Sequence, residues 1–306
     1  MLLSPNLRGA LFMSVSMAGF AMNDAITKYT SASMNMGQVM LIRGLFATLF
    51  VVSLAWYQGA LRNPRLTLQP LVLLRAACEA AATICFLIAL AQLPIANVSA
   101  VLQALPLAVT MGAALVYDER VGWRRWLAIA AGFSGVMIIV RPGFEGFSAY
   151  ALIALVSVGF CAIRDLATKR IPHEIPALLV SSTTSIAVTI CGALLVQPMG
   201  GWAPMSSSGT SLLAGCAVLL VVGYHFIILA MRSGDISFVA PFRYTSLLWS
   251  ILMGFLIFGD VPDLAMTVGA IIIVGSGLYT LYREQVVGRP RAATESTRPA
   301  MASDRL

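Results

Sequence analysis

The sequence has 306 residues, of which 59% are hydrophobic and 11% are charged, and its formal net charge is +7. A soluble domain of this length needs far more charge on its surface, so the composition excludes an ordinary soluble globular protein. Long apolar runs separated by short polar breaks indicate instead an all-α membrane protein that crosses the bilayer several times.

Ten apolar runs are long enough to cross the hydrocarbon layer, which requires about 20 residues per helix. In the first half we expect helices at about 7–27, 37–57, 71–91, 95–117 and 124–140. In the second half we expect them at about 147–168, 175–196, 209–231, 236–258 and 264–282. The first run ends in charged residues without a cleavage signal of the Ala-x-Ala type, so we expect it to be retained as a span.

Lys and Arg residues are distributed unequally between alternate connections. Fifteen lie at the N-terminus, in the even-numbered connections and at the C-terminus, whereas the odd-numbered connections hold only Lys28 and Arg141. Because cytoplasmic loops are enriched in Lys and Arg, we expect both termini in the cytoplasm. These basic residues meet anionic lipid head groups, so the bilayer is the expected partner and nucleic acid is not. The tail at 285–306 is expected to be disordered and cytoplasmic.

A charged motif occurs twice, 141 residues apart. Residues 23–28 read Asn-Asp-Ala-Ile-Thr-Lys, and residues 164–169 read Arg-Asp-Leu-Ala-Thr-Lys. Each Asp precedes its Lys by four residues, so on a helix the two side chains share one face and can form an ion pair.

The repeat extends along both halves of the chain. Residues 86–91 resemble 226–231, the acidic turn at 118–119 corresponds to 259–260, and Ser134-Gly135 corresponds to Ser276-Gly277. Each half holds five predicted helices, an odd number. The second copy therefore enters the membrane from the opposite side, which predicts an inverted repeat of the kind found in many secondary transporters.

These features resemble the drug/metabolite transporter superfamily, and in particular its EamA-domain branch. The resemblance rests on the two five-helix halves, the acidic turn at 118–119, the Gly-rich fifth and tenth helices and Arg141-Pro142-Gly143. It covers residues 5–284 and implies one EamA-like repeat at 5–142 and a second at 147–284. It also implies a bacterial inner-membrane location and a central cavity lined mainly by helices 1, 3, 4, 6, 8 and 9.

The resemblance implies transport of a small molecule. Within the family the two charged motifs look most similar to bacterial proteins of vitamin or cofactor uptake, riboflavin first and S-adenosylmethionine second. Export of amino acids or other metabolites is the alternative. An intramembrane enzyme is not expected, because the carboxylates lie on separate helices near opposite faces and His225 is the lone candidate base.

Polar and ionisable residues within the spans are the candidate gate and cavity residues, because such groups usually face protein or a wet cavity. Inversion of the halves predicts an outer gate that contains Asp24, Lys28, Arg43 and Gln103. It predicts an inner gate that contains Glu79, Arg164, Asp165, His225 and Arg243. The alternative for Asp24 with Lys28, and for Asp165 with Lys169, is an interfacial pair whose lysine reaches toward the head groups.

The same residues suggest the kind of substrate. The within-span charges at 24, 43, 79, 164, 165 and 243 sum to zero, which favours a neutral or zwitterionic molecule. Phe242 and Tyr244 on the ninth helix are candidates for stacking on a flat ring, with packing or lipid contact as the alternative.

Prolines and glycines in the spans suggest where helices bend and where they pack closely. Pro106 and Pro241 permit bending around the cavity. Gly132, Gly135 and Gly269 favour close helix packing, within one molecule or between two copies in a homodimer.

The sequence lacks a phosphate-binding Gly-x-x-x-x-Gly-Lys-Ser/Thr loop and any His/Cys/Asp cluster with metal-ligand spacing. The five cysteines lie in the predicted spans and are interpreted as small packing residues. No cofactor or metal is expected, and uphill transport would draw on an ion gradient. Asp24, Glu79 and Asp165 are the candidate proton carriers.

Overall fold

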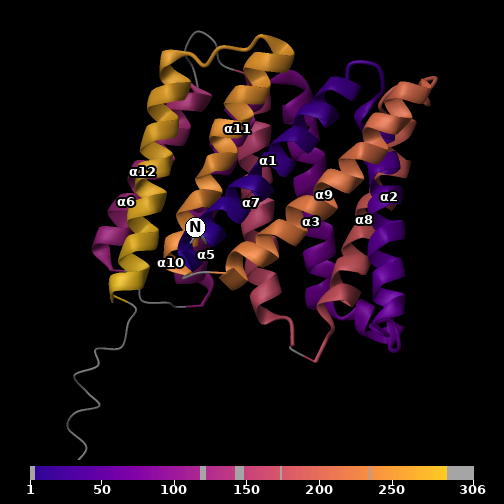
Figure 1. Ribbon diagram of the computed structural model, residues 1–306, viewed down its shortest axis with the longest axis horizontal. Coiled ribbons are helices and arrows are strands. Elements are labelled where there is room, and N and C mark those ends of the chain that lie inside the picture. Colours follow the sequence, from indigo (N-terminus) through magenta and orange to yellow (C-terminus); the bar gives the residue numbers. More distant parts are fainter. Residues whose placement is uncertain (1–3, 118–121, 142–147, 173, 234–235, 288–306) are drawn as a thin grey trace, which may run out of the picture.

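The computed structural model describes residues 4–117, 122–141, 148–172, 174–233 and 236–287 (Figure 1). The predicted acidic turn at 118–119, Pro142, Gly143 and residues 288–306 of the predicted tail lie outside the described residues. Residues 285–287, which were expected in the disordered tail, instead continue the last helix. Within the described ranges all regular secondary structure is helical. Ten helical segments there are long and apolar enough to span a membrane, which confirms the predicted fold class.

The first half contains five spans. They are α1 (Pro5–Thr30), α2 (Met36–Tyr57), α3 (Pro70–Gln92), α4 (Ile95–Leu102) continued by α5 (Leu105–Val116), and α6 (Trp123–Val140). A short 3-10 helix, η1 (Pro64–Leu68), connects α2 to α3.

The second half contains five more. They are α7 (Ala149–Arg170), α8 (Ala177–Val196), α9 (Ser207–Ser233), a composite ninth span, and α12 (Leu264–Val287). The ninth span consists of α10 (Ile236–Val239), the 3-10 helix η2 (Ala240–Tyr244), α11 (Thr245–Met253) and the π-helical turn η3 (Gly254–Phe258).

Local sequence explains several helix boundaries. The side chains of Ser4, Asn35 and Ser148 each accept a hydrogen bond from a backbone amide in the first turn of the helix that follows. Such capping satisfies amides that have no partner within the helix. Polar residues just before apolar runs therefore set where α1, α2 and α7 begin.

The fourth span is broken where proline predicts a bend. α4 ends at Leu102 and α5 begins at Leu105, with Pro106 in its first turn. Proline has no amide hydrogen, and its ring collides with the carbonyl four residues earlier, which here belongs to Leu102. The single helix expected at 95–117 is therefore two helices.

The helices pack in pairs that join the two halves of the chain. α1 packs on α9, α3 on α7, α2 on α8, and α6 on α12. In Figure 1 the α6–α12 pair forms one end of the molecule and the α2–α8 pair forms the other. A shift of 141 residues relates α1 to α7 and α3 to α9, so the contacts of α1 with α9 and of α7 with α3 are equivalent.

Close backbone approach at the two end pairs requires glycine. A Cβ atom on Gly192 of α8 would lie 2.6 Å from the backbone nitrogen of Leu41 on α2. A Cβ atom on Gly135 of α6 would lie 2.8 Å from the carbonyl oxygen of Gly269 on α12. Thr48 and Thr189, which occupy equivalent positions in the two halves, have hydroxyl oxygens 2.9 Å apart across the α2–α8 contact. The sequence signal for close packing at Gly135 and Gly269 thus corresponds to packing within one chain.

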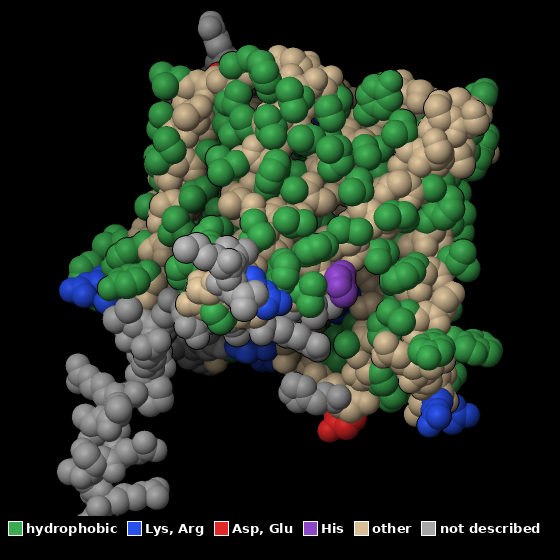
Figure 2. Space-filling view, viewed as in Figure 1, with side chains coloured by type: hydrophobic (Ala, Val, Ile, Leu, Met, Phe, Trp, Pro, Cys, Tyr) green, Lys and Arg blue, Asp and Glu red, His purple; other side chains and the backbone are tan. Residues whose placement is uncertain are grey.

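The spans define two faces of the molecule. Because ten is an even number, α1 begins and α12 ends on the same face, which we call the terminal face; α1 ends and α12 begins on the opposite face. Hydrophobic side chains cover the broad side of the molecule between these faces, and the Lys and Arg side chains visible there lie toward the lower edge (Figure 2). This surface suits lipid along the side and water or head groups at the edge.

Candidate functional site

The two cross-half helix pairs carry the same hydrogen bond. In the α1–α9 pair, the Ser16 hydroxyl donates to the carbonyl oxygen of Gly223 over 2.6 Å. In the α7–α3 pair, the Ser157 hydroxyl donates to the carbonyl oxygen of Ala82 over 2.8 Å. Both partners differ by 141 residues, so each half presents the same contact to the other.

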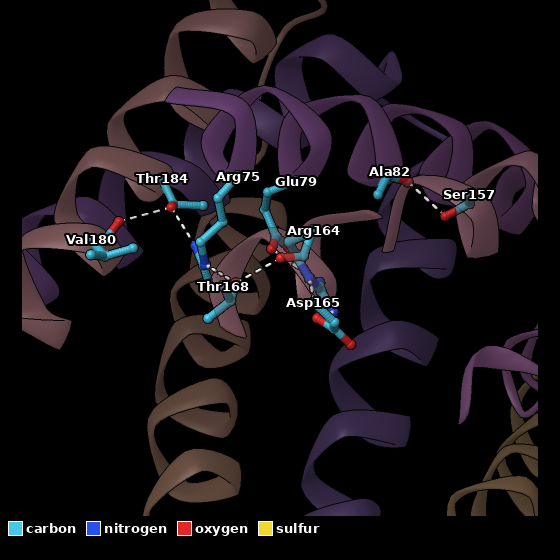
Figure 3. A network of polar contacts seen from close by, with 9 residues as sticks. All are labelled: Arg75, Glu79, Ala82, Ser157, Arg164, Asp165, Thr168, Val180 and Thr184. Carbon is cyan, nitrogen blue, oxygen red and sulfur yellow. Dashed lines mark hydrogen bonds and ion pairs between the residues drawn. The ribbon is translucent and has the colours of Figure 1, made fainter. Parts of the chain in front are cut away.

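Near the terminal face the second copy of the charged motif forms ion pairs. The Arg164 guanidinium bonds the Glu79 carboxylate at 3.0 Å and the Asp165 carboxylate at 2.8 Å. Figure 3 shows these three side chains, which we call the terminal-face cluster, between α3 and α7. The side chains of Arg164 and Glu79 are only 20% and 26% exposed, so the pair is partly shielded from solvent. The cluster therefore ties α7 to α3.

Arg75 adds a second link at the same face; it is one of the fifteen Lys and Arg residues that were counted only for membrane orientation. It donates to the Thr168 hydroxyl over 2.9 Å and to the Thr184 hydroxyl over 2.5 Å, and so joins α3, α7 and α8 (Figure 3). Thr168 is the threonine of the second motif. The position of Thr168 in the repeated motif is the sequence feature from which this contact could have been suspected.

Toward the opposite face the first copy of the motif forms a different arrangement. Asn23 donates to the Asp24 carboxylate over 2.9 Å, and Arg43 donates to the Thr27 hydroxyl over 3.2 Å. We call Asn23, Asp24, Thr27 and Arg43 the opposite-face cluster. Arg43 lies within Coulombic range of Asp24, but among the described residues no ion pair joins them. The Asn23 side-chain oxygen is buried and has no hydrogen-bond partner there.

Lys28 does not pair with Asp24 as the four-residue spacing suggested. Its ammonium group donates to the carbonyl oxygens of Leu90 at 2.9 Å and Leu93 at 2.5 Å, at the C-terminal end of α3. The last carbonyl groups of a helix have no partner within it and carry the negative end of the helix dipole, so they attract a cation. The ammonium group also lies over the Phe258 ring, 5.4 Å from its centroid.

Lys169, the equivalent lysine of the second motif, also lies over an aromatic ring. Its ammonium group is 5.3 Å from the centroid of Tyr117, and the Arg170 guanidinium is 4.4 Å from the same ring. The Tyr117 hydroxyl donates to the carbonyl oxygen of Leu166. Sequence reasoning missed Tyr117 and Phe258, although both end the fourth span of their half and are 141 residues apart.

Gln103 joins the two broken spans. Its amide donates to the Ser246 hydroxyl over 2.5 Å, and one turn away the Ser99 hydroxyl donates to Ser250 over 2.7 Å. These contacts connect α4 to α11. Gln103 thus belongs to neither charged cluster.

The remaining predicted residues lie elsewhere on the second half. His225 and Arg243 are exposed and are not members of the terminal-face cluster. Phe242 packs beside Phe238, with ring centroids 5.7 Å apart, in a small apolar core. Tyr244 is buried, and its hydroxyl occupies the space that a Cβ atom on Gly277 of α12 would need.

Two grooves on the described surface lie away from both clusters. One, of about 470 Å³, is formed by α2 and α8 and is lined by Leu45, Thr48, Leu49, Val52, Ser53, Trp56 and Ile186. The other, of about 560 Å³, lies between α6 and α12. Their apolar walls on the lateral surface suit lipid chains rather than a polar metabolite.

Comparison with known proteins gives consistent matches. The model of the EamA-like transporter family matches residues 7–141. The chain is 31% identical to the riboflavin transporter of Vibrio cholerae over 88% of this chain and 91% of that protein. It is 24% identical to the S-adenosylmethionine uptake transporter of Rickettsia prowazekii, over 91% and 94% of the two chains. It is 25% identical to a pseudopaline exporter of Pseudomonas aeruginosa, over 87% and 93%.

A solved crystal structure of another protein shares the fold, with a TM-score of 0.56 at 16% identity, over 89% of this chain and 98% of that one. The ten spans and these matches define a multi-pass membrane protein of the class that transports small molecules. Within that class, the chain belongs to the EamA-like transporter family.

Proposed function

We propose that this protein carries a small neutral or zwitterionic metabolite across the bacterial inner membrane by alternating access, and that its substrate is a vitamin or cofactor taken up by the cell, riboflavin first. The observation that carries the mechanism is the set of reciprocal contacts between the halves. Ser16 with Gly223 and Ser157 with Ala82 are the same contact made by opposite copies. Halves that make equivalent contacts can exchange conformations, which is the basis of alternating access in inverted repeats.

The repeats are assigned to residues 5–142 and 147–284, and the termini to the cytoplasm. The excess of Lys and Arg on the terminal side supports this orientation. Reporter fusions after Arg125 and at the C-terminus are expected to report cytoplasm, and a fusion near Gly201 is expected to report periplasm. A periplasmic C-terminus would contradict the orientation.

Charge supports the substrate class. The six charged residues expected within the spans from the sequence are three acidic ones, at 24, 79 and 165, and three basic ones, at 43, 164 and 243. Further basic residues, among them Arg75 and Arg170, lie in the outer turns of the observed spans and are not included. The six charges sum to zero, so the electrostatic field does not favour a strongly charged substrate. Riboflavin is placed first because the riboflavin transporter of Vibrio cholerae is 31% identical to this chain. Uptake of S-adenosylmethionine and export of another metabolite are the alternatives, each represented among the relatives.

Growth of a riboflavin auxotroph tests the proposal. Expression of this chain is expected to lower the external riboflavin needed for growth and to raise the accumulation of radiolabelled riboflavin inside the cell. The lipid-facing variant Leu49→Ala, whose side chain is 69% exposed outside both clusters, is expected to behave as the parent. Wild-type membrane levels without any gain in growth or accumulation would exclude riboflavin uptake, and labelled S-adenosylmethionine would then be tested in the same cells.

A further inference from the structure

Two lysine–aromatic contacts in the structure are equivalent under the internal repeat. Lys28 at the end of α1 lies over Phe258 at the end of η3, and Lys169 near the end of α7 lies over Tyr117 at the end of α5. The ammonium groups lie 5.4 Å and 5.3 Å from the ring centroids. Both the lysines and the rings differ by 141 residues, so each half supplies the lysine for one contact and the ring for the other.

The two contacts lie at opposite faces of the membrane. α1 ends on the opposite face, whereas α7 ends on the terminal face, because six spans separate the start of the chain from the end of α7. Each contact bridges the two halves at the ends of spans that bound the centre of the molecule. Both are formed in this structure, so both ends are held together at once.

Each contact covers buried apolar residues beneath it. Under Lys28 and Phe258 lies a core of Ala25, Leu90, Ile95 and Met253, in which Ala25 is fully buried. At the terminal face the position equivalent to Ala25 is Leu166, which is 8% exposed and whose carbonyl accepts from Tyr117. Separation of either ring from its lysine would expose that layer to the solvent of one face only.

The chemistry of the contact suits a reversible closure. A cation over an aromatic face is attracted to the ring without a fixed hydrogen-bond direction, so it can slide apart and re-form. On the opposite face Lys28 also binds carbonyl groups of α3, and Asp260, two residues after Phe258, adds a nearby negative charge. On the terminal face Arg170 adds a second cation over Tyr117.

We propose that Phe258 and Tyr117 are the gate residues of the two faces, that each closes its face by receiving the motif lysine of the other half, and that transport opens them alternately. Both contacts are formed in the structure, so neither of these gates is open in it. The assignment of a transport role rests on the proposed function, but the opening of each face can be measured without any substrate.

The test uses full-length protein whose five native cysteines are replaced, with one reporter cysteine at a time. Ala25→Cys reports the opposite face, Leu166→Cys reports the terminal face, and an impermeant thiol reagent is applied separately to each side. Phe258→Leu keeps apolar bulk but removes the ring, and is expected to raise labelling of the cysteine at 25 about two- to fivefold, with no change at 166. Tyr117→Leu is expected to raise labelling of the cysteine at 166 by the same factor, with no change at 25.

Ring-retaining variants provide the matched control. Phe258→Trp keeps an aromatic face for the lysine, so it is expected to label at the parent rate. Tyr117→Phe keeps the ring but loses the hydrogen bond to the Leu166 carbonyl, so it is expected to label between the parent and Tyr117→Leu. Equal labelling of leucine and aromatic variants would overturn the proposal, as would a leucine variant that opened both faces equally. If the variants still change labelling on one face only but the protein does not transport riboflavin, the proposed gates are supported and only the proposed substrate is wrong.

Discussion

The two copies of the charged motif occupy equivalent helices but have different electrostatic surroundings. At the terminal face Arg164 joins two carboxylates, one from its own helix and one from α3. Toward the opposite face the same position is Asn23, and Asp24 receives an amide hydrogen bond without an ion pair among the described residues. The residue immediately before the shared Asp is therefore one source of the difference between the ion-paired copy and the copy without an ion pair.

The third span of each half, α3 and α9, also differs in charge. α3 supplies Arg75 and Glu79, whereas the positions 141 residues later on α9 are Cys216 and Leu220. Cys216 still approaches Thr27, at 4.0 Å, just as Arg75 bonds Thr168. The contact between these helices is thus retained, while the charged partners that α3 supplies have no charged equivalent on α9.

The largest expected effect comes from removal of the arginine. Arg164→Ala leaves Glu79 and Asp165 without their shared counter-ion in a partly buried site, and is expected to lower the free energy of unfolding by about 3 kcal/mol. Asn23→Ala at the equivalent position is expected to change it by about 1 kcal/mol or less. Equilibrium unfolding in mixed micelles measures both.

A conservative variant separates charge from geometry at this site. Arg164→Lys keeps the charge but cannot bond two carboxylates through a planar fork, and is expected to fall between the parent and Arg164→Ala. Equal losses for Arg164→Ala and Asn23→Ala would show that the two copies contribute alike, and the comparison would fail.

A smaller effect is expected when the terminal-face cluster is transplanted to the other copy. Asn23→Arg alone introduces a cation opposite the apolar Leu220, and Leu220→Glu alone introduces an unpaired carboxylate. Together they reproduce the pair of Arg164 and Glu79, so the double variant is expected to be more stable than the sum of the single changes by about 1 kcal/mol. A double-mutant cycle of unfolding free energies measures this coupling. Strict additivity would mean that the equivalent positions do not face each other across α1 and α9.

Much of the fold was predictable because the length and spacing of the apolar runs determine where the spans lie. The ten spans were expected within a few residues of their observed ends, and the break in the fourth follows from Pro106. The repeat also predicted that Glu79, Arg164 and Asp165 lie together, as they do in the terminal-face cluster, but it grouped His225 and Arg243 with them, and these two lie elsewhere.

The sequence did not predict the partners of the motif lysines. Spacing along one helix suggested Asp24 for Lys28, but the carbonyl oxygens of α3 and the ring of Phe258 compete for the same ammonium group. Those partners come from other spans, and their positions depend on how helices cross. Periodicity along one segment contains no information about such crossings, although the 141-residue offset relates Tyr117 to Phe258 once one of them is known.

The contact between Thr48 and Thr189 has a consequence for paired substitutions. The two residues are 141 positions apart, and each meets its own counterpart across the α2–α8 contact, as residues do in the isologous interface of a symmetric dimer. A side chain introduced at both positions would therefore oppose an identical side chain. Two aspartates would repel each other there, whereas two serines could keep the hydroxyl contact.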